Sequence, residues 1–259
     1  MKWADYCVSK LTLDDRGFIE SIIYYQDFGE SLGHEIEGTR AWMVRQVEQG
    51  KTFCSIKKNI HGNWNLIGNF TYNNFLFSWH LIPKNLTKRK IFKSYYHSDD
   101  QVYKKFFENL FGDLVINKSV EDGDINEENS DDYVKQLIQK GYLSDTTVLI
   151  VLIGPNTRHR KHIDWEISGA LNHKVGDKYA GILGLLLPNH PNYSTDHYTS
   201  SLLPGRLADN LKSGYAILRN WTDDRIKMQE YIELAQKKRS TNADNIDNSR
   251  LQMTKNTNE

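Results

Sequence analysis

The sequence has few of the features that mark secreted, membrane-spanning or metal-binding proteins. It contains two cysteines, Cys7 and Cys54, without a CxxC pair or a histidine at metal-ligand spacing, so we expect two buried, reduced thiols. No apolar run reaches the roughly 18 residues that a membrane-spanning helix needs. The first residues lack the apolar centre of a signal peptide. We therefore expect a cytoplasmic protein with no bound metal.

The sequence also lacks an excess of charge of either sign. The 33 basic and 33 acidic residues give a formal net charge of zero, so no overall field attracts nucleic acid or an anionic membrane. The glycine-rich patterns GxGxxG and GxxxxGK[ST] are absent, which removes the usual phosphate-binding loops. With 39% hydrophobic and 25% charged residues, the composition is that of an ordinary soluble globular protein. We expect neither nucleic-acid nor membrane binding.

Residues 1–87 are predicted to form a small α+β domain of their own. Strand-like and helix-like segments follow one another in the order β-β-α-β-β. Pro83 and the basic stretch 84–90 mark the junction with the next domain. The predicted strands are 4–13, 18–25, 51–58 and 63–72, and the predicted helix is 39–49.

Residues 88–238 show alternating strand-like and helix-like segments, which predicts an α/β domain with a five-stranded parallel sheet and flanking helices. The helix predicted at 101–111 carries Val102, Phe106 and Leu110 at i, i+4, i+8 spacing. Residues 239–259 are rich in asparagine without apolar periodicity, so we expect a disordered tail. The predicted strands are 91–96, 113–116, 148–153, 179–187 and 214–221. Further helices are predicted at 133–140, around Glu166 and at 223–238.

Two familiar acidic sites can be tested against the sequence. A phosphoacceptor receiver domain needs an aspartate at the end of its third strand, whereas this strand runs into Gly154 and Pro155. The loop 121–132 carries seven acids in twelve residues. It departs from a calcium loop because Glu127 stands at the glycine position and Tyr133 at the closing glutamate. We therefore interpret this loop as a solvated acidic surface.

The most informative segment runs from Thr146 to Leu171, where a buried strand leads through Gly154 and Pro155 into a helix with the acid Glu166. Ligands of parallel sheets bind beyond the carboxyl ends of the strands. Segments 94–99, 121–132 and 154–166 are predicted to converge there. Helical spacing places Glu166 beside the apolar stripe of this helix, half-buried, with Gly169 leaving space next to it. The alternative is a surface acid paired with a nearby histidine or lysine. Trp165, taken alone, is more often a packing residue than a stacking platform. The stripe consists of Ile163, Ile167, Ala170 and Leu171.

This second domain resembles the TIR-like domains of bacterial anti-phage defence of the Thoeris type. The resemblance rests on residues 91–99, 144–154 and 161–167, and it covers a little over half of the chain. Family members have a hydrophobic strand, a serine–aromatic turn and an aspartate, followed later by an aromatic-Glu-Ile segment, here Trp165 to Ile167. They often place a tryptophan four residues before the glutamate, where this chain has His162.

The resemblance implies a TIR-like, flavodoxin-like fold and an NAD glycohydrolase or ADP-ribosyl cyclase with Glu166 as the catalytic residue. NAD is then the substrate, and no further cofactor is required. The product would be a cyclic or variant ADP-ribose that a separate effector protein reads, with a phage component as a candidate trigger and a homo-oligomer formed through TIR-like surfaces. The residues assigned to substrate binding are Ser94, Tyr95, Tyr96, His97, Asp99, His162 and Trp165.

Two other functions remain open from the sequence. A TIR-like domain also serves as a non-catalytic assembly module, in which the acidic loop and the basic linker form complementary interfaces. In the first domain, aromatic residues from Trp64 to Trp79 alternate along the predicted hairpin. They suit either core packing or recognition of a phage component or effector.

Overall fold

The computed structural model describes residues 3–13, 19–26, 33–37, 40–73, 78–118 and 143–257. The chain divides into two compact units, Met1–Leu86 and Thr87–Glu259, and each has its own sheet. The acidic loop expected at 121–132 and the helix expected at 133–140 lie outside the described residues.

The first unit is built on a six-stranded sheet in the order β3-β2-β1-β4-β5-β6. It contains the predicted ββαββ elements and two further strands, β3 and β6, which form the sheet's two edges. Edge strands pair on one side only, so their sequences need less of the apolar alternation by which strands are recognised. The elements are β1 (Tyr6–Leu13), β2 (Ile19–Gln26), β3 (Gly33–Glu37), α1 (Arg40–Glu48), β4 (Phe53–Lys58), β5 (Trp64–Asn73) and β6 (Ser78–Pro83).

Aromatic side chains hold helix α1 against this sheet. The Trp42 ring lies 5.1 Å from Tyr6, 5.3 Å from Tyr24 and 5.7 Å from Phe53, measured between ring centroids. These three rings come from β1, β2 and β4, so the short helix covers this half of the sheet. On the parallel strands β1 and β4, Cys7 and Cys54 are register partners. Both thiols are free and buried, as expected, with their sulfur atoms 3.5 Å apart.

The second unit is an all-parallel five-stranded sheet in the order β11-β10-β9-β7-β8. This is the flavodoxin-like strand order, so the predicted fold is confirmed. Strand β9 has the predicted bounds, and every residue of β9 and β10 is buried, as the continuous apolar runs indicate. The elements are β7 (Arg89–Ser94), α2 (His97–Phe111), β8 (Val115–Asn117), β9 (Val148–Ile153), α4 (Lys161–Asn172), β10 (Gly181–Leu186), α5 (Gly205–Lys212), β11 (Ile217–Asn220) and α6 (Arg225–Thr241).

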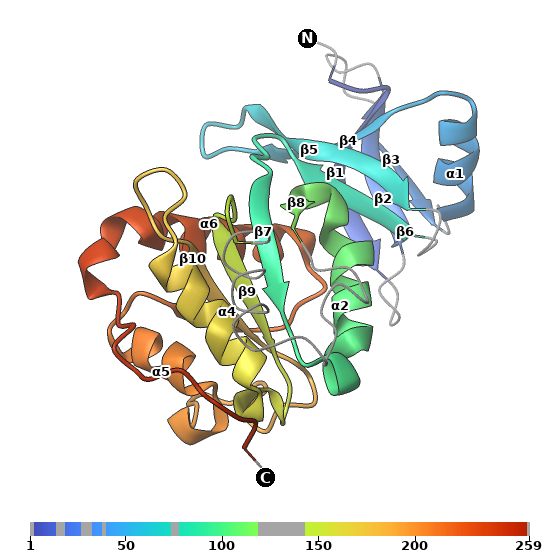
Figure 1. Ribbon diagram of the computed structural model, residues 1–259. Helices are drawn as coiled ribbons and strands as arrows, with labels where there is room; N and C mark the ends of the chain where they lie inside the picture. Colours follow the sequence, from blue (N-terminus) through green and yellow to red (C-terminus); the bar gives the residue numbers. More distant parts are fainter. Residues whose placement is uncertain are drawn as a thin grey trace. The chain divides into compact units, whose positions relative to one another are not determined.

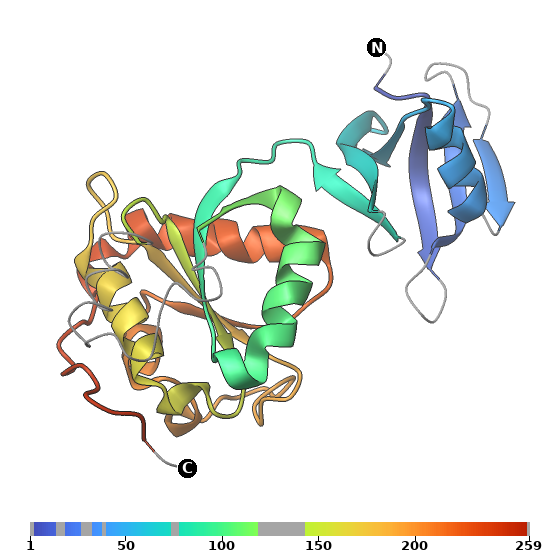
Figure 2. The same cartoon turned by 45° about the vertical axis from the view of Figure 1, so that its right-hand side comes forward.

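The handedness of the crossovers places the helices on the two faces of this sheet. Parallel strands are joined by right-handed crossovers, and the chain moves one way from β7 to β8 but the opposite way from β9 to β11. Helix α2 therefore lies on one face, and α4 and α5 lie on the other. Helix α6 contacts α2 and shares its face, and Figures 1 and 2 show α4 and α6 on opposite sides of the strands.

The buried side of α2 differs from the one that apolar spacing suggests. Val102 and Phe106 have 49% and 46% of their surface exposed, whereas Phe107 and Phe111 are buried. The rings of Phe107 and Phe111 pack against Trp221, at 6.4 and 6.0 Å between centroids. The i, i+4, i+8 pattern therefore marks the outer face, because phenylalanines stand on both faces of this helix.

The disordered tail expected from residue 239 is wrong for the described residues up to 257. The last turns of α6 include residues 239–241, and the segment 246–257 then runs back along α4. Arg206 of α5 donates to the carbonyls of Asn248 and Arg250, and Trp165 Nε1 donates to the carbonyl of Met253. Hydrogen bonds to buried partners, rather than apolar periodicity, order this segment. Helix α5 itself was not predicted, because it follows the long polar loop 188–205.

Candidate active site

Glu166 is the buried acid that helix α4 brings to the predicted site. Ile163, Ile167, Ala170 and Leu171 on α4 pack into the core and fix the rotation of the helix. Only 7% of Glu166 is exposed, so it is buried rather than half-exposed. Its carboxyl group lies beside the Ser94 hydroxyl at the carboxyl end of β7, where ligands bind to parallel sheets. Glu166 forms no ion pair with any described residue. The structure therefore does not support the alternative of a surface acid paired with a neighbouring cation.

Burial controls the electrostatics of this glutamate. Loss of water around the carboxyl group raises the pKa of Glu166 to about 8, and the Ser94 hydroxyl opposes part of this rise. Among the described residues, neither Glu166 Oε2 nor Ser94 Oγ has a partner at good hydrogen-bonding geometry. A buried oxygen without a donor is costly. The carboxyl end of β7 therefore holds a carboxyl oxygen and a hydroxyl that the described residues leave unsatisfied.

Folding stability provides a test of this burial that does not depend on activity. Because the folded-state pKa of Glu166 lies above the usual 4.5, folding favours the protonated form. Its contribution to stability is complete below pH 4.5 and is lost as the pH rises to about 8. We expect Glu166→Gln to melt at a higher temperature than wild type at about pH 9, with the gap closing towards about pH 5. Thermal melts across this range measure it, and parallel curves for the two proteins would contradict the burial. Glu230→Gln, on the exposed face of α6, is the matched control.

The turn after β7 holds the other predicted substrate-binding residues. Tyr95 is buried and stacks on His97 with ring centroids 4.4 Å apart, and its hydroxyl lies 3.4 Å from His97 Nδ1. The Arg160 guanidinium sits 3.8 Å above the Tyr96 ring. Asp99 Oδ2 accepts a hydrogen bond of 2.9 Å from Asn156 Nδ2. The β7–α2 turn and the β9–α4 loop are thus joined near the amino end of the helix that carries Glu166.

Asp100, which the sequence analysis passed over in favour of Asp99, is the centre of this junction. It is fully buried, and burial raises its pKa to about 6 against the opposing effect of the Thr157 hydroxyl. Thr157 Oγ1 donates to Asp100 Oδ2 at 3.0 Å and accepts from the Gly154 amide at 2.9 Å. The sequence does contain two hints of this junction. One is a second acid in the first turn of α2, and the other is the glycine that follows β9.

Position 154 requires a glycine, because the Asp100 carboxyl group occupies the space that a side chain at this position would need. A Cβ atom built at Gly154 would clash with Asp100 Oδ1. We expect Gly154→Ala to reduce the free energy of unfolding by about 1–3 kcal/mol, the usual cost of overpacking. Urea titration measures the change. Gly112→Ala is the control, since a Cβ there meets no atom within 4 Å, and equal effects of the two substitutions would contradict this account.

Trp165 and His162 lie on α4 with Glu166, and their rings contact each other. Trp165 is 1% exposed and belongs to the core, and its Nε1 donates to the Met253 carbonyl at 2.8 Å. The His162 ring lies 5.1 Å from the Trp165 ring. The structure therefore brings Ser94 to Glu166 and places Trp165 between the core and the C-terminal segment. The roles of Ser94, His162 and Trp165 in substrate binding remain predictions.

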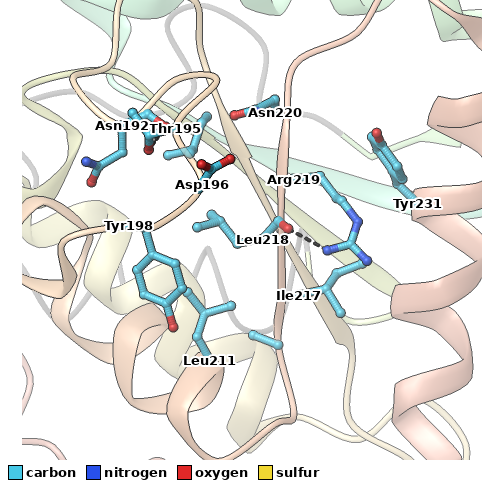
Figure 3. Close-up of a pocket in the computed structure, with 12 residues that line it drawn as sticks. Asn192, Thr195, Asp196, Tyr198, Leu211, Ile217, Leu218, Arg219, Asn220 and Tyr231 are labelled. Carbon is cyan, nitrogen blue, oxygen red and sulfur yellow. Dashed lines mark hydrogen bonds between the residues drawn. The ribbon is translucent and has the colours of Figure 1, made fainter.

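A separate cavity of about 450 Å³ opens at the outer strand β11. Figure 3 shows Tyr198, Asp196 and Arg219 around it, with Arg219 Nη1 donating to the Leu218 carbonyl at 2.7 Å. Glu166 does not line it. Within the described ranges, no three His, Cys, Asp or Glu side chains come together to hold a metal ion. None of the helices described there combines the length and the apolar character needed to cross a bilayer.

Comparison with known proteins identifies the family of the second unit. Residues 92–192 match the family described as "Thoeris protein ThsB, TIR-like domain". Among solved structures, the TIR domains in "Structure of the activated Roq1 resistosome directly recognizing the pathogen effector XopQ" match with 15% identity and a TM-score of 0.30. That match covers 60% of this chain and 85% of the other. No curated protein matches the chain significantly.

Proposed function

Because residues 92–192 form a TIR-like domain of the Thoeris type, we propose that the chain cleaves NAD at the nicotinamide–ribose bond, with Glu166 as the catalytic residue. The product is a cyclic or variant ADP-ribose. The observation that carries this proposal is the buried Glu166 carboxyl group, which has an unpaired oxygen beside Ser94. A carboxylic acid with a strongly perturbed pKa at the carboxyl edge of a parallel sheet is characteristic of a functional site.

The chemistry requires one carboxylate. When the C–N bond breaks, its electron pair leaves with the nicotinamide nitrogen, so nicotinamide departs as a neutral molecule and needs no general acid. The ribosyl centre becomes oxocarbenium-like, as in glycoside hydrolysis. Glu166 in its ionised form stabilises this positive charge and accepts hydrogen bonds from the ribose hydroxyls. The proposed contributions of the turn after β7 are polar contacts from Ser94, His97 and Asp99 and apolar walls from Tyr95 and Tyr96.

The positive nicotinamide ring of the substrate supplies the ionisation that this role needs. In the ligand-free protein, burial holds the Glu166 pKa at about 8. A cation within about 4–6 Å of a carboxyl group favours the charged form. Substrate binding therefore lowers this pKa and prepares the carboxylate. Water that reaches the ribosyl centre gives ADP-ribose and a proton, whereas exclusion of water leaves a nucleophile of the same molecule to close a ring.

The test is direct incubation of the purified full-length chain with NAD, with and without lysate from phage-infected cells. Liquid chromatography with mass spectrometry quantifies nicotinamide and identifies the nucleotide product. We expect nicotinamide and an ADP-ribose species in equal amounts, either at once or after addition of the lysate. No nicotinamide release under either condition would contradict the proposal. The proposed downstream partner is a separate effector protein that binds this product.

A second function, assembly through the surface of the TIR-like domain, is favoured by the exposed apolar side of α2. Val102 and Phe106 are about half exposed there, and exposed aromatic side chains often mark interfaces. Sedimentation velocity should show concentration-dependent association that Phe106→Ser weakens. A monomer at every concentration would exclude this function. Assembly and catalysis are compatible, because a second copy is able to complete a site.

A further inference from the structure

Arg160 is a cation at the predicted site that has no counter-charge among the described residues. It is the N-cap residue of α4, the helix that carries Glu166. Its guanidinium sits 3.8 Å above the Tyr96 ring, and no described side chain forms an ion pair or a hydrogen bond with it. Arg158 in the same loop differs, because it donates to His159 Nε2 and to the Ser201 carbonyl. The positive charge of Arg160 is therefore available to a ligand.

The outer nitrogen atoms of this guanidinium are open to solvent. Of the Arg160 side chain, only Nε is buried without a partner. Nη1 and Nη2 also make no hydrogen bond to a described residue, so they are not enclosed by the protein. The cation–π contact with Tyr96 holds the group in place and uses none of these N–H donors. An arginine that is already held loses little freedom when it binds an anion.

The turn after β7 places this cation close to Glu166. Ser94 ends β7 and lies beside the Glu166 carboxyl group. Tyr96, two positions further on, still has an extended backbone with φ −83° and ψ 111°. Alternate residues of an extended chain point to the same side and are about 7 Å apart. Arg160, above Tyr96, therefore lies next to the position where the ribose is proposed to bind.

We propose that Arg160 binds the diphosphate of NAD while Glu166 acts on the ribose. This inference rests on the proposed NAD cleavage and adds the group that recognises the anionic part of the substrate. In NAD the diphosphate is attached to the ribose whose C–N bond breaks, so its cation is needed beside the ribose. The planar guanidinium of arginine donates two parallel hydrogen bonds to phosphate oxygens. Because the sequence has no glycine-rich phosphate loop, a side chain takes this role.

Steady-state kinetics of the full-length chain with two substrates test the assignment. Arg160→Gln should raise KM for NAD about ten- to a hundredfold and change kcat less than about twofold, because the diphosphate is bound equally in the ground and transition states. Nicotinamide riboside has the same C–N bond but no phosphate, so its kcat/KM should not change. Arg160→Lys keeps the charge and should recover part of the loss. Lys174→Gln removes an exposed charge just beyond the other end of α4 and should behave like wild type.

Binding of ADP-ribose tests the same contact without catalysis. ADP-ribose keeps the diphosphate and has no nicotinamide to lose, so titration calorimetry measures the contact whether or not the chain cleaves NAD. We expect Arg160→Gln to raise the Kd of ADP-ribose about ten- to a hundredfold with an unchanged melting temperature.

The outcomes separate this inference from the proposed function. A wild-type chain that binds ADP-ribose through Arg160 but releases no nicotinamide would contradict the proposed cleavage and support the diphosphate site. Absence of ADP-ribose binding to wild type, or equal affinity of wild type and Arg160→Gln, would overturn the role of Arg160. An equal loss of kcat/KM on NAD and on nicotinamide riboside would also overturn it, because the effect would then not involve phosphate.

Discussion

Glu166→Gln is expected to lower the rate of nicotinamide release from NAD by about a thousandfold, the upper range for loss of one group that stabilises developing charge. Glutamine keeps the size and the hydrogen-bonding oxygen of the side chain but carries no negative charge. The loss should appear in kcat, because the positive ribosyl centre exists only in the transition state, and KM should also rise, because the carboxylate attracts the positive nicotinamide ring of bound NAD. Initial rates over a series of NAD concentrations separate kcat from KM.

Two controls accompany this prediction: the stability of the Glu166→Gln variant and the activity of a variant with the same substitution at an exposed glutamate. Because the substitution removes a buried ionisable group, the variant should be at least as stable as wild type at neutral pH, so misfolding does not account for lost activity. Glu230→Gln on the exposed side of α6 should retain full activity. Equal rates for wild type and Glu166→Gln would remove Glu166 from the mechanism, even if NAD is still consumed.

Arg206→Met is expected to reduce the free energy of unfolding by about 3–5 kcal/mol, the cost of leaving one partner of a buried ion pair uncompensated. Arg206 Nε lies 2.9 Å from Asp164 Oδ1, and 1% and 6% of the two side chains are exposed. The same guanidinium holds the carbonyls of Asn248 and Arg250. Loss of this cation therefore leaves the buried Asp164 carboxylate without its ion-pair partner. It also removes hydrogen bonds that hold the C-terminal segment near α4.

Chemical denaturation of three variants separates the charge from the packing. Arg250→Met breaks the exposed pair with Asp209 on the same segment and should cost less than about 1 kcal/mol. The double variant Asp164→Leu with Arg206→Met removes both charges and should recover part of the stability. A single-variant loss no larger than that of Arg250→Met would show that the buried pair does not hold the segment.

Much of the second unit could be predicted because its strands are continuous apolar runs. Residues 148–153 are buried on both faces, and Gly154 and Pro155 then end the strand. The apolar stripe on α4 likewise indicates which side of the helix meets the sheet. Helical spacing therefore placed Glu166 next to the core. The depth of its burial depends on β7, which is far away in the sequence.

The features that could not be predicted depend on single long-range contacts. Asp99 and Asp100 share the faces of α2 that carry Phe106 and Phe107, and because each face has a phenylalanine, the sequence does not show which of the two aspartates is buried. In the structure Asp100 meets Thr157 and the space above Gly154. The C-terminal segment lacks apolar periodicity, and its order comes from the pair of Arg206 and Asp164.

The most direct test of the central claim is mass spectrometry of nucleotides from cells that express the chain, before and after phage infection. We predict that infected cells with the wild-type chain lose NAD and gain nicotinamide together with a cyclic or variant ADP-ribose. Cells with Glu166→Gln should show neither change. Identical nucleotide profiles for the wild-type and Glu166→Gln cells after infection would contradict the assignment of this domain as an NAD-cleaving enzyme that acts through Glu166.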